Sequence, residues 1–154
     1  IVMGGQLQRG ANGFAGEIGH MVVQHEGELC VCGRRGCWER YASGSALRML
    51  SGGMSGEEVF AEASSGDSHA QSVVATFADW VAVGLASLTN ICDPEVIVIG
   101  GGVVQSFEFV LESVSKSFSA ALYSSESRPH PALHVAALGE RAGAIGCALF
   151  MTQG

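Results

Sequence analysis

The second half of the sequence predicts an α/β fold in which helices and strands form layers. Apolar residues recur there at steps of three and four over two long stretches, the period of a helix with one core face. Two nearly continuous apolar runs, Glu95 to Ile99 and Leu133 to Leu138, alternate with these stretches, as in strands buried on both faces. A composition of 47% hydrophobic and 15% charged residues over 154 residues suits one domain with a substantial core.

Short elements are expected in the first half. Residues 1–9 have the pattern of a hairpin that turns at a Gly-Gly pair, and residues 21–23 form an apolar run typical of a short strand. A glycine-rich loop separates the two. Residues 38–50 are predicted to be helical, with a break near Ser43.

Two capping boxes predict helix starts in the middle of the chain. Ser55 to Glu58 opens a short helix, and Ser68 to Gln71 opens a long one that Pro94 ends. A further helix follows the triplet Gly100 to Gly102, and residues 142–151 form a closing helix. The expected core faces are Val74, Phe77, Val81, Leu85 and Leu88 in the long helix, and Phe107, Val110, Leu111, Val114, Phe118 and Leu122 in the next.

Charge and cysteine usage exclude several classes of protein. The net charge is −7 and no basic stripe exists, so a nucleic-acid groove is not expected. The most apolar stretch, residues 72–91, contains Asp79 and is typical of a buried helix rather than a membrane span. No signal peptide is visible, and three of five cysteines are bunched, which favours a reducing cytoplasm. Cys92 and Cys147 are expected to be small core residues.

A cluster of nitrogen and sulfur donors predicts a metal site. His20, Cys30, Cys32 and Cys37 give the spacing H-x9-C-x-C-x4-C, and four such donors form a tetrahedral Zn²⁺ site. The C-x-C gap is tighter than generic zinc patterns, but Gly33 and Gly36 let the loop fold back so that the three sulfurs converge. The alternatives are a disulfide or free buried thiols. A closed shell of one histidine and three cysteines indicates structural rather than catalytic zinc.

Two glutamates flank this cluster. Glu17 lies three residues before His20, and Glu39 lies two residues after Cys37. If a metal clamps the loop, both carboxylates are carried to one side, where they could accept hydrogen bonds from a polyol or sugar. His20 could then bind the metal through one ring nitrogen and donate to a ligand oxygen through the other. The alternative, that both glutamates are solvated surface charges, stays open.

The glycine triplet Gly100, Gly101 and Gly102 lies between a buried strand and a helix. Free N–H groups at a helix start form a phosphate site when no side chains obstruct them. The pattern is neither a dinucleotide fingerprint nor a P-loop, so a simple tight turn is the alternative. Further glycines between residues 139 and 146 could let the last helix pack close to this point.

Together these segments resemble the C-terminal half of the ROK family (repressors, open reading frames, kinases), which contains sugar kinases and sugar-responsive repressors. The wording GCWERYASG is most similar to the actinobacterial glucokinases of that family. The resemblance is carried by RGANGFAGEIGH (Arg9 to His20), CVCGRRGCWERYASGSAL (Cys30 to Leu47), DPEVIVIGGGV (Asp93 to Val103) and LGERAGAIGCA (Leu138 to Ala148).

The resemblance implies an actin-like ATPase, ribonuclease H-like fold, with residues 1–154 as its C-terminal (large) domain and residues 20–39 as a zinc-binding loop. It implies an ATP-dependent hexose kinase that uses ATP with Mg²⁺, has glucose as its leading substrate and forms a homodimer. The residues it implicates are His20, Cys30, Cys32 and Cys37 for structural Zn²⁺, Glu17, His20 and Glu39 for sugar hydroxyls, and Gly100, Gly101, Gly102 and residues 139–146 for the nucleotide.

The sequence also departs from the family pattern. The Asn-Asp motif that supplies the general base and the Gly-Thr-Gly phosphate loop are both absent, and Asp79 and Asp93 are poor substitutes. We therefore expect an N-terminally truncated chain with no catalytic residue of its own, inactive as a kinase in isolation. The alternatives are the effector-binding domain of a sugar-responsive ROK repressor and a zinc-stabilised interaction domain without a small ligand.

Overall fold

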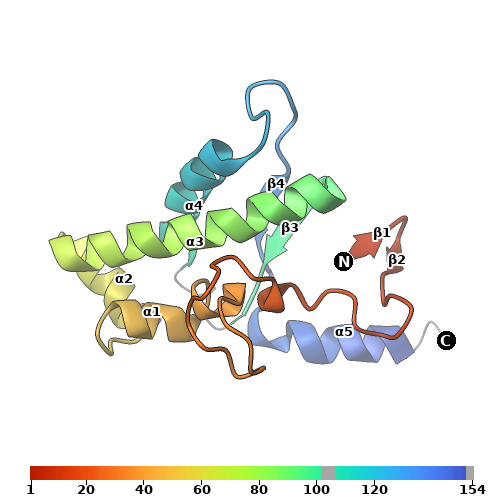
Figure 1. The fold of residues 1–154 in the computed structure, drawn as a ribbon, viewed down its shortest axis with the longest axis horizontal. Helices are drawn as coiled ribbons and strands as arrows, with labels where there is room; N and C mark the ends of the chain where they lie inside the picture. Colours follow the sequence, from red (N-terminus) through yellow and green to blue (C-terminus); the bar gives the residue numbers. More distant parts are fainter. Residues whose placement is uncertain (102–106, 152–154) are drawn as a thin grey trace. The chain divides into compact units, whose positions relative to one another are not determined.

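The computed structural model describes residues 1–101 and 107–151 (Figure 1). The chain forms two compact units. Unit 1 comprises Ile1–Arg40 and unit 2 comprises Tyr41–Gly154. Unit 1 contains the candidate metal ligands, and unit 2 contains the long helices and the parallel strands.

Unit 1 is mostly loop. The predicted hairpin is confirmed, since β1 (Val2–Met3) pairs antiparallel with β2 (Gln6–Leu7). Two short 3₁₀ helices follow, η1 (Ile18–His20) and η2 (Trp38–Arg40). The strand expected at residues 21–23 is wrong, because only one of its residues forms a β-bridge. Its bridge partner, Cys37, is followed directly by η2, so the pairing does not continue on that side.

Unit 2 begins with three helices, α1 (Gly44–Leu50), α2 (Gly56–Ser65) and α3 (Ser68–Cys92). The box at Ser55 is confirmed, with Glu58 N–H donating to the Ser55 hydroxyl and Ser55 N–H donating to the Glu58 carboxylate. The second box is wrong by one residue. Asp67, not Ser68, is the N-cap, and its carboxylate accepts from the Ala70 N–H at 2.7 Å. A carboxylate at a helix N-terminus also meets the positive end of the helix dipole.

The core of unit 2 lies where α3 packs against α2 and α4 (Phe107–Ala121) (Figure 1). The predicted faces are confirmed where their side chains are described, although Leu88 and Leu111 are only half-buried. α3 is long and apolar enough to cross a membrane, but more than half of its apolar window is buried. The buried members of the two faces are Val74, Phe77, Val81 and Leu85 of α3, and Val110, Val114, Phe118 and Leu122 of α4 and its C-terminal end.

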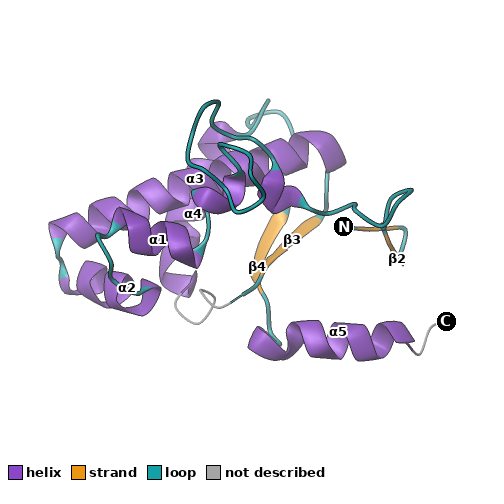
Figure 2. Cartoon of the chain, turned by 60° about the horizontal axis from the view of Figure 1, so that its bottom comes forward, coloured by secondary structure: helices purple, strands orange, loops and turns teal. Residues whose placement is uncertain are grey.

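The two strands of unit 2 form a parallel pair connected by α4. β3 (Val96–Ile99) lies beside β4 (Ala132–Val135), with Val96 opposite Ala132 (Figure 2). The expectation that both strands are buried on both faces is wrong for this chain. Val96 and Val98 are 45% and 62% exposed.

The closing helix is confirmed as α5 (Ala142–Met151), and a 3₁₀ helix that was not predicted, η4 (Gly139–Arg141), leads into it. β4 begins one residue before the predicted run and ends at Val135, so residues 136–138 are not strand. α5 is largely exposed where its side chains are described, although its sequence is almost wholly apolar.

Candidate metal centre

The four predicted metal ligands lie together in unit 1. One ligand atom each from His20, Cys30, Cys32 and Cys37 can be chosen so that all four lie within 4.8 Å of one another. Cys32 Sγ is 3.6 Å from Cys37 Sγ, and Cys30 Sγ is 3.8 Å from His20 Nδ1. A tetrahedral Zn²⁺ with bonds of about 2.0–2.3 Å separates such donors by about 3.5–3.8 Å. The donor types and their spacing therefore fit a four-coordinate metal ion.

Two short antiparallel pairings bring the ligands together. Val22 forms a β-bridge with Cys37, and Leu29 forms one with Arg35. Gly36 lies between the two pairings with a φ of +79°, and a Cβ at this position would lie 1.8 Å from a backbone carbonyl oxygen. Only glycine fits this combination of conformation and close approach. The loop therefore depends on its sequence at Gly36 as well as on its ligands.

The sulfurs differ in their surroundings. Cys30 begins a tight turn in which the Gly33 N–H donates to its carbonyl at 2.9 Å, and this turn leaves Cys32 exposed. The backbone N–H of Arg34 lowers the pKa of Cys32, with smaller help from the neighbouring thiols, whereas burial raises the pKa of Cys37 to about 12. Because metals bind thiolates, an ion at this site must displace the Cys37 proton.

The two carboxylates lie around His20. Glu17 Oε2 is 4.0 Å from His20 Nε2, and Glu39 Oε2 is 4.0 Å from His20 Nδ1. η1 and η2 approach closely, since a Cβ on Gly19 would lie 3.5 Å from the Glu39 Cβ. Nδ1 also faces the sulfur of Cys30, so it is the nitrogen placed for a metal, while Nε2 points towards Glu17. The candidate metal cluster (His20, Cys30, Cys32 and Cys37) therefore adjoins a partly exposed acidic rim, formed by Glu17 and Glu39.

The glycine triplet is only partly described. Gly100 and Gly101 follow β3 directly, whereas Gly102 lies outside the described residues. Gly101 has a φ of +109°, and a Cβ on Gly100 would lie 3.3 Å from the Ala136 Cβ, so both positions favour glycine for backbone reasons. The two glycines inside α5 have no described atom within 4 Å of a Cβ position, so no close packing explains them here.

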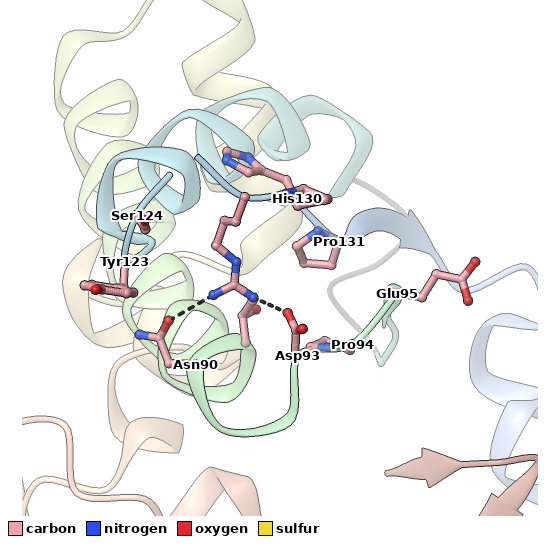
Figure 3. A pocket seen from close by; sticks show the side chains of 11 residues that line it. Asn90, Asp93, Pro94, Glu95, Tyr123, Ser124, His130 and Pro131 are labelled. Atoms are coloured by element: carbon pink, nitrogen blue, oxygen red, sulfur yellow. Dashed lines mark hydrogen bonds and ion pairs between the residues drawn. The ribbon is translucent and has the colours of Figure 1, made fainter. Parts of the chain in front are cut away.

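Unit 2 contains a hollow of about 650 Å³ at the amino ends of β3 and β4 (Figure 3). The Arg128 guanidinium donates to the Asn90 side chain and forms an ion pair with Asp93. No sequence pattern indicated this hollow, since its lining comes from three separate segments. Ligands of open α/β sheets bind at the carboxyl ends of the strands, so the hollow lies at the opposite end. Outside this hollow, the Asp79 carboxylate accepts a hydrogen bond from the Ser117 hydroxyl at 2.6 Å.

Comparison with known proteins decides the family. The model of the ROK family matches residues 1–154. The chain belongs to the ROK family. Its structure superposes on a ROK family glucokinase from Streptomyces griseus, determined in complex with glucose and AMPPNP, with a TM-score of 0.93 at 36% identity. That match covers 99% of this chain and 56% of the other. The fold is therefore the actin-like α/β fold of the ROK proteins.

ROK relatives of known sequence include both kinases and repressors. The glucokinase of Streptomyces coelicolor is 32% identical over 96% of this chain and 54% of its own length. The xylose repressor of Bacillus subtilis is 30% identical over 95% of this chain and 39% of its own length. The chain thus spans about half of the glucokinase and a smaller share of the repressor. Because both relatives match the same part of this chain, that part does not by itself distinguish a kinase from a repressor.

Proposed function

We propose that this chain is the sugar-binding part of an ATP-dependent hexose kinase. The kinase transfers the γ-phosphoryl group of ATP to the 6-hydroxyl of a hexose, and glucose is the leading candidate for that hexose. The observation that carries the proposal is the convergence of Glu17 and Glu39 on His20 beside the metal cluster. The likeness to the Streptomyces griseus glucokinase, described with glucose and AMPPNP, supports it.

Each residue of this site has a distinct role in the proposal. The carboxylates of Glu17 and Glu39 accept hydrogen bonds from sugar hydroxyls, and His20 donates through Nε2 to a sugar oxygen. His20 Nδ1 and the three clustered sulfurs hold a Zn²⁺ ion, which supplies rigidity rather than reactivity because a closed four-ligand shell leaves no position for substrate. A rigid frame matters because phosphoryl transfer depends mainly on positioning.

In this proposal, the glycine-rich segments of unit 2 bind the nucleotide. Backbone N–H groups at Gly100, Gly101 and Gly102 donate to the phosphate oxygens of the Mg²⁺–ATP complex, with the region of residues 139–146 nearby. The general base is an aspartate outside these residues, so the 154-residue chain alone is expected to bind zinc and transfer no phosphate. We further propose a cytoplasmic homodimer that binds no nucleic acid through this domain.

Glu39→Gln is expected to weaken glucose binding by about 10–100-fold, because a charge-assisted hydrogen bond contributes about 1.5–3 kcal/mol. The measurement is the KM for glucose of the full-length protein, in an assay that couples ADP release to a chromogenic reaction. Glu62→Gln is the matched control, since Glu62 is exposed on α2 and outside the metal cluster and its acidic rim. A KM for the Glu39 variant equal to that of the control would remove this carboxylate from the sugar site.

A second candidate function is effector binding in a sugar-responsive repressor, favoured by the 30% identity to the Bacillus subtilis xylose repressor over 95% of the chain. The same assay separates the two. ADP release that depends on the hexose supports the kinase. Sugar binding without ADP release, together with sugar-dependent DNA binding by the full-length protein, supports the repressor.

A further inference from the structure

The three clustered cysteines differ in their access to solvent. Cys30 and Cys37 are 2% and 0% exposed, whereas Cys32 is exposed. Cys32 lies in the outer part of the tight turn that Gly33 closes. A small oxidant dissolved in water can therefore reach Cys32 without any opening of the loop, but it reaches the other two sulfurs only after the loop opens.

Cys37 is the better placed disulfide partner for an oxidised Cys32. Their sulfurs are 3.6 Å apart, so a disulfide requires them to approach by about a further 1.5 Å. Cys30 is a poorer partner, because it lies only two residues away within the same turn, where the short ring strains a disulfide. Between Cys32 and Cys37 lie four residues that include Gly33, whose surroundings are open, so the backbone can adjust there.

We propose that Cys32 is an oxidation site through which hydrogen peroxide releases the metal, by forming a Cys32–Cys37 disulfide that removes two of the four ligands. The metal loss follows from the cluster alone. The consequence for sugar binding rests on the function proposed above. Cys37 directly precedes η2, which carries Glu39, so withdrawal of Cys37 from the cluster also displaces one carboxylate of the acidic rim.

The chemistry balances with peroxide as the only co-reactant. The Cys32 thiolate attacks one oxygen of hydrogen peroxide, the O–O bond breaks, and a sulfenic acid and hydroxide form. The Cys37 thiolate then attacks the Cys32 sulfur, the S–O bond breaks, and a second hydroxide leaves. Two electrons pass from the two sulfurs to the two peroxide oxygens, and both hydroxides take protons from solvent. The metal has no redox role, since Zn²⁺ does not change its charge.

The test uses the full-length, zinc-loaded protein, titrated with hydrogen peroxide. Released metal is followed with a chromogenic chelator, and cysteine states are mapped by mass spectrometry of non-reduced peptides. We expect one zinc released for each Cys32–Cys37 disulfide, and recovery of the bound metal after a dithiol reductant and Zn²⁺ are added. Cys147→Ser is the control variant, because Cys147 is exposed but lies on α5 outside the cluster, and it should release zinc as the parent does.

Three outcomes would overturn the proposal. The first is modification of Cys30 before Cys32, and the second is zinc release with sulfinic acid in place of the disulfide. The third is full retention of zinc at a peroxide dose that oxidises all of Cys147. A glucose titration of the same samples keeps the two proposals apart. If the reduced protein binds no glucose but the disulfide still releases zinc, the sugar function fails and the oxidation site stands.

Discussion

Replacing Cys37 with serine in the full-length protein is expected to weaken zinc binding by about a hundredfold or more. Structural zinc sites bind their ion with about 10–16 kcal/mol, so one ligand in four carries about 3 kcal/mol, and 1.4 kcal/mol is a factor of ten. Cys37 is 0% exposed, so bulk water cannot take its place without opening the loop. The measurement is competition with a chelator of known affinity, together with elemental analysis of the purified protein.

Cys147→Ser is the matched control for this prediction. It makes the same chemical change at an exposed cysteine that lies outside the cluster, so its zinc affinity should equal that of the parent. Because the Cys37 variant also loses the order of the loop, its glucose affinity should fall with its zinc content. Parent-like zinc affinity in the Cys37 variant would contradict the assignment of this sulfur as a ligand.

Gly36→Ala is expected to prevent the loop from closing, at a cost of more than about 4 kcal/mol in the stability of the loop. An alanine Cβ would lie 1.8 Å from the Gln24 carbonyl oxygen and 2.8 Å from the carbonyl carbon, a clash between backbones that a side-chain rotation cannot relieve. The Gly36 N–H donates to the Glu28 carbonyl, and its own carbonyl accepts from the Val23 N–H. A backbone shift would therefore also break both pairings of the loop.

Gly33→Ala isolates the conformational part of this cost. Gly33 has a φ of +84° but no atom within 4 Å of its Cβ position, so only the left-handed conformation is penalised, by about 1–2 kcal/mol. Thermal unfolding and zinc content of both variants give the comparison. We expect the Gly33 variant to retain zinc with a small decrease in Tm, and the Gly36 variant to lose it. Equal losses in the two variants would mean that the close approach to Gln24 is not important.

The grouping of the four candidate metal ligands was predictable because its signal is local. His20, Cys30, Cys32 and Cys37 lie within eighteen residues, and glycines at the turns give the backbone the freedom to bring them together. The α3 and α4 core faces were predictable for a similar reason, since their helical period is a property of each segment alone. The roles of the carboxylates were not predictable from spacing, and they stay a proposal that rests on their 4.0 Å approach to His20.

The errors occurred where a residue's environment depends on distant parts of the chain. The apolar run of β3 predicted burial on both faces, but Val98 is exposed because the cover of a strand comes from other segments. The N-cap of α3 is Asp67 and not the predicted Ser68. Both side chains offer an oxygen to the helix N-terminus, but only the Asp67 carboxylate also interacts favourably with the helix dipole. The hollow around Arg128 combines three segments with no common motif, so no local pattern could indicate it.

The most direct measurement is a calorimetric titration of glucose into the full-length protein with its metal bound, after removal of the metal by a chelator, and after Zn²⁺ is restored. If the metal cluster positions Glu39 and His20 for the sugar, the metal-free protein should bind glucose at least about tenfold more weakly, and added Zn²⁺ should recover the affinity. An unchanged glucose affinity in the metal-free protein would contradict a metal-positioned sugar site.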